Sequence, residues 1–122
     1  MASGTLLISA ARTATEASVD QDQSNFGGGH IIVNVTAAGT STLTITIQGK
    51  DPISGTYYTI LAGTALVGTG IQVLKVFPGI TAAAGGSVSD TLPDSWRVNA
   101  VKGDASSWTY SIAYSAKSNR VR

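Results

Sequence analysis

The sequence contains no cysteine and only one histidine, His30. The first absence excludes disulfide bonds and cysteine-based zinc sites. A Ser-His-Asp triad needs a histidine held between a nucleophile and a carboxylate, and the sequence has no Gly-x-Ser-x-Gly motif for His30 to serve. We therefore expect His30 to be structural or solvated, and we expect the protein not to be an enzyme.

Charge is also scarce. Charged residues make up 12% of the 122 residues, against about 25% in an ordinary soluble domain. The formal net charge is +1, and the basic residues are scattered rather than clustered, so we expect no nucleic-acid partner. Copies with so little charge repel one another weakly, which favours a surface that faces other protein. A secreted β-domain rich in serine and threonine is the alternative interpretation of this composition.

Long apolar runs are absent as well. The longest, around residues 60–67, is broken by glycine and threonine and is too short to cross a bilayer. The N-terminus lacks the basic start of a secretory signal. We expect no membrane partner, and we expect the chain to stay in the cytoplasm where it is made unless it leaves as part of a larger particle.

The acidic residues give no metal or cofactor site. Asp20-x-Asp22-x-Ser24 resembles the start of a calcium loop, but Asn25 and Ile31 stand where the loop glycine and the closing glutamate would be. No lysine follows the glycines at 27–29, so they do not form a phosphate loop. Most of the other carboxylates occupy positions where aspartate caps turns, namely Asp51, Asp90, Asp94 and Asp104. We predict no catalytic residue, metal or cofactor.

What the sequence does contain is alternation. Between Ser41 and Leu61, apolar residues alternate with threonine and glutamine, which places one apolar and one polar face on a strand. Asp51-Pro52 begins a turn, and Gly55 allows the chain to return into a second strand. This segment predicts a β-hairpin.

Similar patterns recur along the chain, and no stretch of ten residues keeps a helical period with plausible caps. We predict an all-β fold, an antiparallel β-sandwich or barrel of about seven to eight strands. Residues 1–29 are predicted to form an N-terminal strand and extended arm, 30–116 the β-sandwich core, and 117–122 a basic C-terminal tail. The segment 11–29 either packs on a neighbouring subunit or is a loose surface loop. Further strands are expected at 5–10, 30–36, 71–77, 95–101 and 107–114.

Few residues qualify as binding residues. Trp96 and Trp108 share faces with aliphatic residues, so we predict both in the core. The protein-interface candidates are an apolar anchor in a polar stretch, one of two consecutive tyrosines that must point outward, and polar or charged residues near the arm and the tail: Phe26, Tyr58, Arg12, His30, Arg120 and Arg122.

Several phrases together resemble a family of small β-proteins encoded among the virion structural genes of tailed bacteriophages. The similarity runs from about Arg12 to Tyr114, and the hairpin turn Gly-Lys-Asp-Pro-x-Ser-Gly is its most specific part. The tail from Lys117 to Arg122 lies outside the pattern. The phrases are Val33–Thr40, Leu43–Leu61, Val76–Ile80, Leu92–Val98 and Trp108–Ile112.

The resemblance implies a head decoration (cement) or minor capsid protein. Such a protein binds the outer surface of the phage head, often as a homotrimer, and bridges capsomers, so its partners would be the major capsid protein and its own copies. Two alternatives remain open. One is a tail, neck or head-fibre-base component, and the other, suggested by the exposed tyrosine, is a carbohydrate-binding module.

Overall fold

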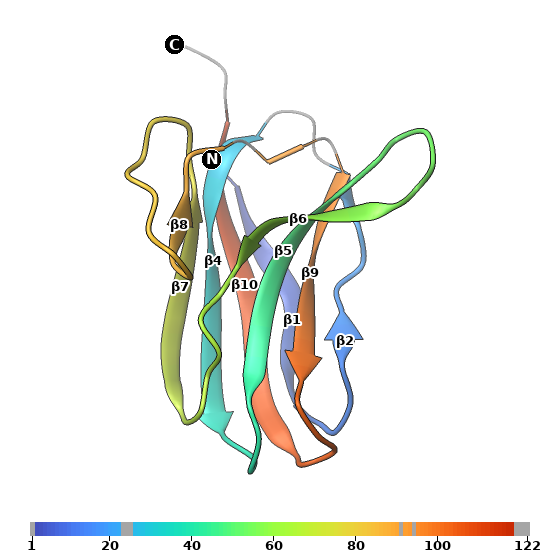
Figure 1. Cartoon of the computed structure of the whole chain (residues 1–122), viewed down its shortest axis with the longest axis vertical. Helices are drawn as coiled ribbons and strands as arrows, with labels where there is room; N and C mark the ends of the chain where they lie inside the picture. Colours follow the sequence, from blue (N-terminus) through green and yellow to red (C-terminus); the bar gives the residue numbers. More distant parts are fainter. Residues whose placement is uncertain (1, 23–25, 91, 94, 119–122) are drawn as a thin grey trace.

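Two β-sheets packed face to face form the molecule (Figure 1). This computed structural model describes residues 2–22, 26–90, 92–93 and 95–118, and those residues include no helix. The prediction of an all-β antiparallel sandwich is therefore confirmed.

In the described part of the chain, ten strands make up the two sheets, more than the seven to eight expected, because three of them are only two residues long. They are β1 (Ala2–Arg12), β2 (Glu16–Ala17), β3 (Gln21–Asp22), β4 (Phe26–Ala37), β5 (Leu43–Lys50), β6 (Tyr57–Ala62), β7 (Gly70–Val76), β8 (Ser87–Val88), β9 (Ser95–Lys102) and β10 (Trp108–Ser118).

The first sheet has the strand order β1-β10-β4-β7-β8, and the second has the order β2-β9-β5-β6, with β3 also paired to β9. Every pairing is antiparallel except that of β7 with β8. Strands that are neighbours in a sheet mostly come from distant parts of the chain. The order of strands therefore depends on the packing of the two layers rather than on local turns.

The core lies between the sheets and follows the alternation in the sequence. Along β5 the side chains of Leu43, Ile45 and Ile47 are fully buried, as the pattern predicts. The two tryptophans, Trp96 and Trp108, are also fully buried, which confirms their predicted core position. Side chains of this size account for much of the apolar surface removed from water.

The β5–β6 hairpin projects beyond the body of the sandwich (Figure 1). Its turn begins at Asp51, whose carboxylate accepts hydrogen bonds from the backbone N–H of Ile53 at 2.9 Å and the hydroxyl of Ser54 at 2.8 Å. Gly55 has a φ of 76°, which only glycine adopts without strain. The hairpin and its turn are confirmed as the sequence predicts them.

The N-terminal region differs from the predicted free arm. Residues 2–12 form a long strand paired with β10, and the segment after it is extended but runs along β9, with which β2 and β3 pair. The predicted boundary between residues 29 and 30 falls inside β4, because the glycines at 27–29 belong to that strand. At Gly28 an added Cβ would overlap the carbonyl oxygen of Val76, so glycine here permits close approach of β7 rather than a loop.

Candidate functional site

The interface candidates whose side chains the structure describes, Arg12, His30 and Tyr58, lie at three different places. Arg12 lies inside the protein. Its guanidinium donates hydrogen bonds to the carbonyl oxygens of Ile8 at 2.7 Å, Tyr110 at 2.9 Å and Ala10 at 3.2 Å, and it pairs with Glu16 at 3.1 Å. It also lies 4.8 Å from the centre of the Tyr110 ring.

This arrangement explains why an arginine tolerates a buried position. The side chain of Arg12 is 8% exposed, and the N–H groups of its planar guanidinium donate hydrogen bonds to carbonyl oxygens of both β1 and β10. β1 is irregular here, with register shifts on either side of Leu7. The structure thus gives Arg12 a role in holding β1 onto β10, and not the surface position that binding a partner requires.

The outcome for the other candidates varies. Phe26 is the first residue of β4 and pairs in register with Ser118; its side chain lies outside the described residues, as do Arg120 and Arg122. His30 lies on β4 with its ring edge-to-face against Phe77, 5.5 Å between ring centres.

His30 belongs to a regular surface on the first sheet. Because Ile31, Val33 and Val35 are buried against the second sheet, the alternate residues of β4 point away from it. Directly paired residues of antiparallel strands share a face, so the register extends this surface to β10 and β7. We call it the outer-face patch, and its nine residues are His30, Ile32, Asn34, Ile71, Val73, Lys75, Ser111, Ala113 and Ser115.

The outer-face patch carries little charge. Lys75 is the only Lys, Arg, Asp or Glu among the nine, and the remaining side chains are apolar, hydroxyl or amide groups and the imidazole of His30. Ile71 is 70% exposed, and Ile32 and Val73 on the same face are partly exposed. The sequence did not lead us to this patch, although it contains one signal. Ile31 and Ile32 are consecutive, and consecutive residues of a strand point to opposite faces, so only one of them can lie in the core.

A polar cluster lies on the opposite side of the molecule, on the second sheet. Asp20, from the segment between β2 and β3, accepts hydrogen bonds from the Tyr57 hydroxyl at 2.7 Å and from Nζ of Lys50 at 3.0 Å. The guanidinium of Arg97 stacks 3.5 Å from the centre of the Tyr57 ring. The cluster therefore holds the N-terminal segment against β5, β6 and β9.

The protonation behaviour of the cluster fits this role. The hydrogen bond from Tyr57, followed by that from Lys50, lowers the pKa of Asp20 below its usual value of 3.8. The same hydrogen bond to Asp20 raises the pKa of Tyr57 above 10.0. Asp20 is thus ionised and Tyr57 neutral at physiological pH, as the geometry of donor and acceptor requires.

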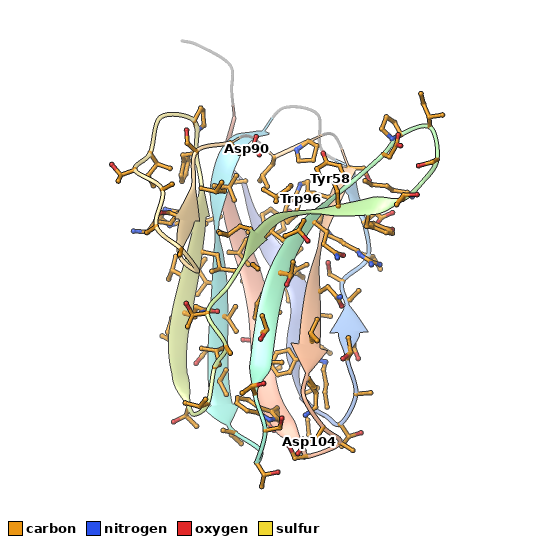
Figure 2. All side chains as sticks on the ribbon, viewed as in Figure 1. Tyr58, Asp90, Trp96 and Asp104 are labelled. Atoms are coloured by element: carbon orange, nitrogen blue, oxygen red, sulfur yellow. The ribbon has the colours of Figure 1, made fainter. Side chains whose placement is uncertain are left out.

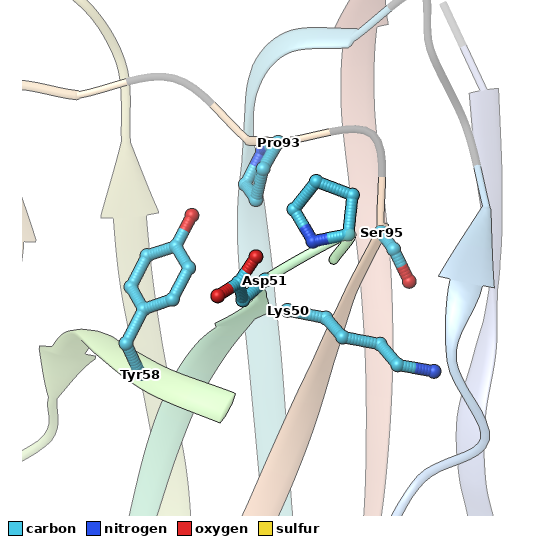
Figure 3. A pocket seen from close by; sticks show the side chains of 6 residues that line it. Lys50, Asp51, Tyr58, Pro93 and Ser95 are labelled. Carbon is cyan, nitrogen blue, oxygen red and sulfur yellow. The ribbon is translucent and has the colours of Figure 1, made fainter. Parts of the chain in front are cut away.

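A pocket of about 530 Å³ lies at one end of the sandwich. It is formed where the base of the β5–β6 hairpin faces the segment before β9, and Tyr58 lies in its wall (Figure 3). Figure 2 places Tyr58 and Trp96 at this end and Asp104 at the other. The lining residues are Lys50, Asp51, Pro52, Tyr58, Pro93 and Ser95.

Tyr57 lies on the outer face of the second sheet with Arg97, whereas Tyr58 lies on the core-facing side, in register with Gly49 and Trp96. Because it lies at the end of the sandwich, Tyr58 is still the more exposed of the two, with 49% of its surface exposed. Sequence reasoning did not find Pro93 or Ser95 as its neighbours, because they come from a segment more than thirty residues away along the chain. Only the packing of β9 beside β5 brings the two segments together.

The described residues contain no group of three or more His, Cys, Asp or Glu side chains that could hold a metal ion. Within the same ranges there is no helix with the length and apolar character of a membrane span. In comparisons with known proteins, no family model, curated protein or solved structure matches the chain. The arrangement offers two surfaces for binding, the outer-face patch and the Tyr58 pocket.

Proposed function

We propose that this protein is a structural component of a phage virion, a decoration or minor capsid protein without catalytic activity. It binds the outside of the assembled head and stabilises the shell by bridging capsomers. Its partners are the major capsid protein and further copies of itself, arranged as a homotrimer. It is made in the host cytoplasm and resides on the outer surface of the head.

The observation that carries this proposal is the outer-face patch. A flat sheet surface with one charge among nine residues is well suited to contact with another protein surface, because little charge must be desolvated on contact. The resemblance of the sequence to virion proteins and the charge content of 12% support the same conclusion.

The patch is too small to form a specific interface by itself. With strands about 4.8 Å apart and same-face residues about 6.8 Å apart, the patch covers roughly 14 Å by 20 Å, or about 280 Å². A specific interface buries about 800 Å² on each partner. The patch is therefore the centre of a contact whose rim comes from neighbouring loops and strands, and repetition over the shell adds avidity.

Attachment to heads that lack the protein tests the proposal. Purified protein is mixed with such heads, and the bound fraction is measured by sedimentation. We expect Ile32→Glu, which places a charge in the centre of the patch, to weaken binding at least about tenfold, because a buried unpaired carboxylate is costly.

Thr44→Glu is the matched control, since Thr44 occupies the equivalent face of the second sheet, on β5. It should leave binding within about twofold of the wild type. Equal binding by both variants, with folding confirmed by circular dichroism, would contradict a contact through the patch. Binding confined to tails would instead favour a tail or neck component.

A further inference from the structure

Tyr58 presents an aromatic ring whose position the strands determine. It pairs in register with Gly49, which in turn pairs with Trp96, so the three residues form one row across β6, β5 and β9. A Cβ atom on Gly49 would lie 2.5 Å from the Tyr58 ring. The absence of a side chain at Gly49 therefore lets the tyrosine ring lie across the strand, half-exposed and fixed in place.

Pro93 and Ser95 form the facing wall of the pocket. The Oγ of Ser95 is buried and has no hydrogen-bond partner within the described part of the chain, and the indole N–H of the adjacent Trp96 is unpaired in the same way. Because both atoms lie below the accessible surface, a ligand in the pocket does not reach them. This wall therefore contributes shape rather than hydrogen bonds.

The charges around the pocket indicate which ligands fit. Nζ of Lys50 is 3.0 Å from Asp20, and Figure 3 shows it directed away from Tyr58. The carboxylate of Asp51 lies on the Tyr58 side of the pocket (Figure 3), and hydrogen bonds from the turn, the one from Ile53 first, lower its pKa. The lining residues thus present a carboxylate acceptor and the aromatic ring of Tyr58 with its hydroxyl, and no cation directed at a ligand.

We propose that this pocket is a binding site for a neutral saccharide. The apolar face of a pyranose ring lies against Tyr58, and its hydroxyls donate hydrogen bonds to the carboxylate of Asp51. The volume of about 530 Å³ lies within the range of roughly 300–1,000 Å³ found for small-molecule sites, and it accommodates one or two sugar rings. The inference is independent of attachment to a phage head, because the pocket and the outer-face patch are separate surfaces.

The test is a titration of the isotopically labelled full-length protein, followed by amide chemical shifts, with glucose, galactose, mannose, N-acetylglucosamine and their disaccharides. For a ligand of about twelve heavy atoms we expect a Kd of about 1–10 mM. The shifts should centre on residues 50–58 and 93–95. Tyr58→Ala should weaken binding at least about tenfold, whereas Tyr58→Phe, which keeps the ring, should stay within about threefold.

Asp51→Asn provides a second variant that leaves the aromatic ring intact, and it should weaken binding about threefold or more because the charged acceptor is lost. Tyr57→Phe is the control, because the Tyr57 ring belongs to the polar cluster on the second sheet and does not line the pocket. It should bind as the wild type does.

Three results would overturn the proposal: no shifts with any sugar at about 50 mM, binding unchanged in both Tyr58→Ala and Asp51→Asn, or shifts with a proline-rich peptide and none with sugars. Each of these measurements uses the isolated protein. A negative result in the sugar titrations would therefore not change the expected result of the head-attachment assay. A negative result in the head-attachment assay would likewise not count against the saccharide site.

Discussion

Replacing Arg12 tests whether this residue joins β1 to β10 or contacts a partner. Three carbonyl oxygens accept hydrogen bonds from its guanidinium, two of them on β1 and one on β10. Arg12→Ala removes all three bonds and the stacking over Tyr110. We expect this variant to fold but to be markedly less stable.

The size of the loss follows from the contacts. Hydrogen bonds from a charged group contribute about 1.5–3 kcal/mol each, and they are not additive when one side chain makes several. The pair with Glu16 adds at most about 1 kcal/mol, because Glu16 is 47% exposed. We expect a total loss of about 3–5 kcal/mol. Arg12→Lys, which keeps the charge but not the fork, should lose about 1–2 kcal/mol.

The free energy of unfolding is measured by urea denaturation, with the slope compared between variants to confirm that the same surface becomes exposed. A loss of this size corresponds to a fall in Tm of roughly 10–25 °C for a domain of this length. Lys75→Ala, at an exposed position, is the control and should stay within about 0.5 kcal/mol of the wild type. An Arg12→Ala protein that is as stable as the wild type but no longer binds heads would refute the structural role.

Other perturbations test different parts of the fold. Gly28→Ala should destabilise by at least about 2 kcal/mol, because its Cβ would overlap the Val76 carbonyl oxygen, whereas Gly68→Ala, with open space around its Cβ, should be close to neutral in the same denaturation assay. Asp20→Asn should cost about 1 kcal/mol at pH 7. The pKa of Asp20 is lowered on folding, so its contribution to stability is present above pH 3.8 and is lost as the pH falls through the folded pKa. The difference in stability between the wild type and Asp20→Asn should therefore vanish in acid. A difference that stays constant with pH would contradict the contact. The pKa of Tyr57 is raised on folding, so its contribution to stability is present below pH 10.0 and is lost as the pH rises through the folded pKa. Urea titrations of the wild type and Tyr57→Phe at alkaline pH check this expectation.

Local alternation made the central strands predictable. Leu43, Ile45 and Ile47 alternate with polar residues, and all three are buried. The turn from Asp51 to Gly55 was also predictable from local chemistry, since proline fixes its own φ and glycine adopts the positive φ that the turn needs. Where burial on one face and turn chemistry decide the structure, the sequence alone is sufficient.

Contacts between distant segments were not predictable in this way. The glycines at 27–29 indicated a loop, but Gly28 is required by the approach of β7, which begins forty residues later. Arg12 looked like a surface charge, because nothing nearby in the sequence shows that carbonyl oxygens of β10 would receive it. The outer-face patch likewise depends on the register of three strands, and register is set by packing of the two sheets.

The central claim is that the outer-face patch attaches this protein to a phage head. The most direct measurement is a cryo-EM reconstruction of heads incubated with the purified protein, at a resolution that distinguishes the two sheets. The account predicts density for the sandwich on the outside of the shell, with β4, β7 and β10 against the major capsid protein. Undecorated heads, or a sandwich that contacts the shell through β5 and β9 instead, would contradict it.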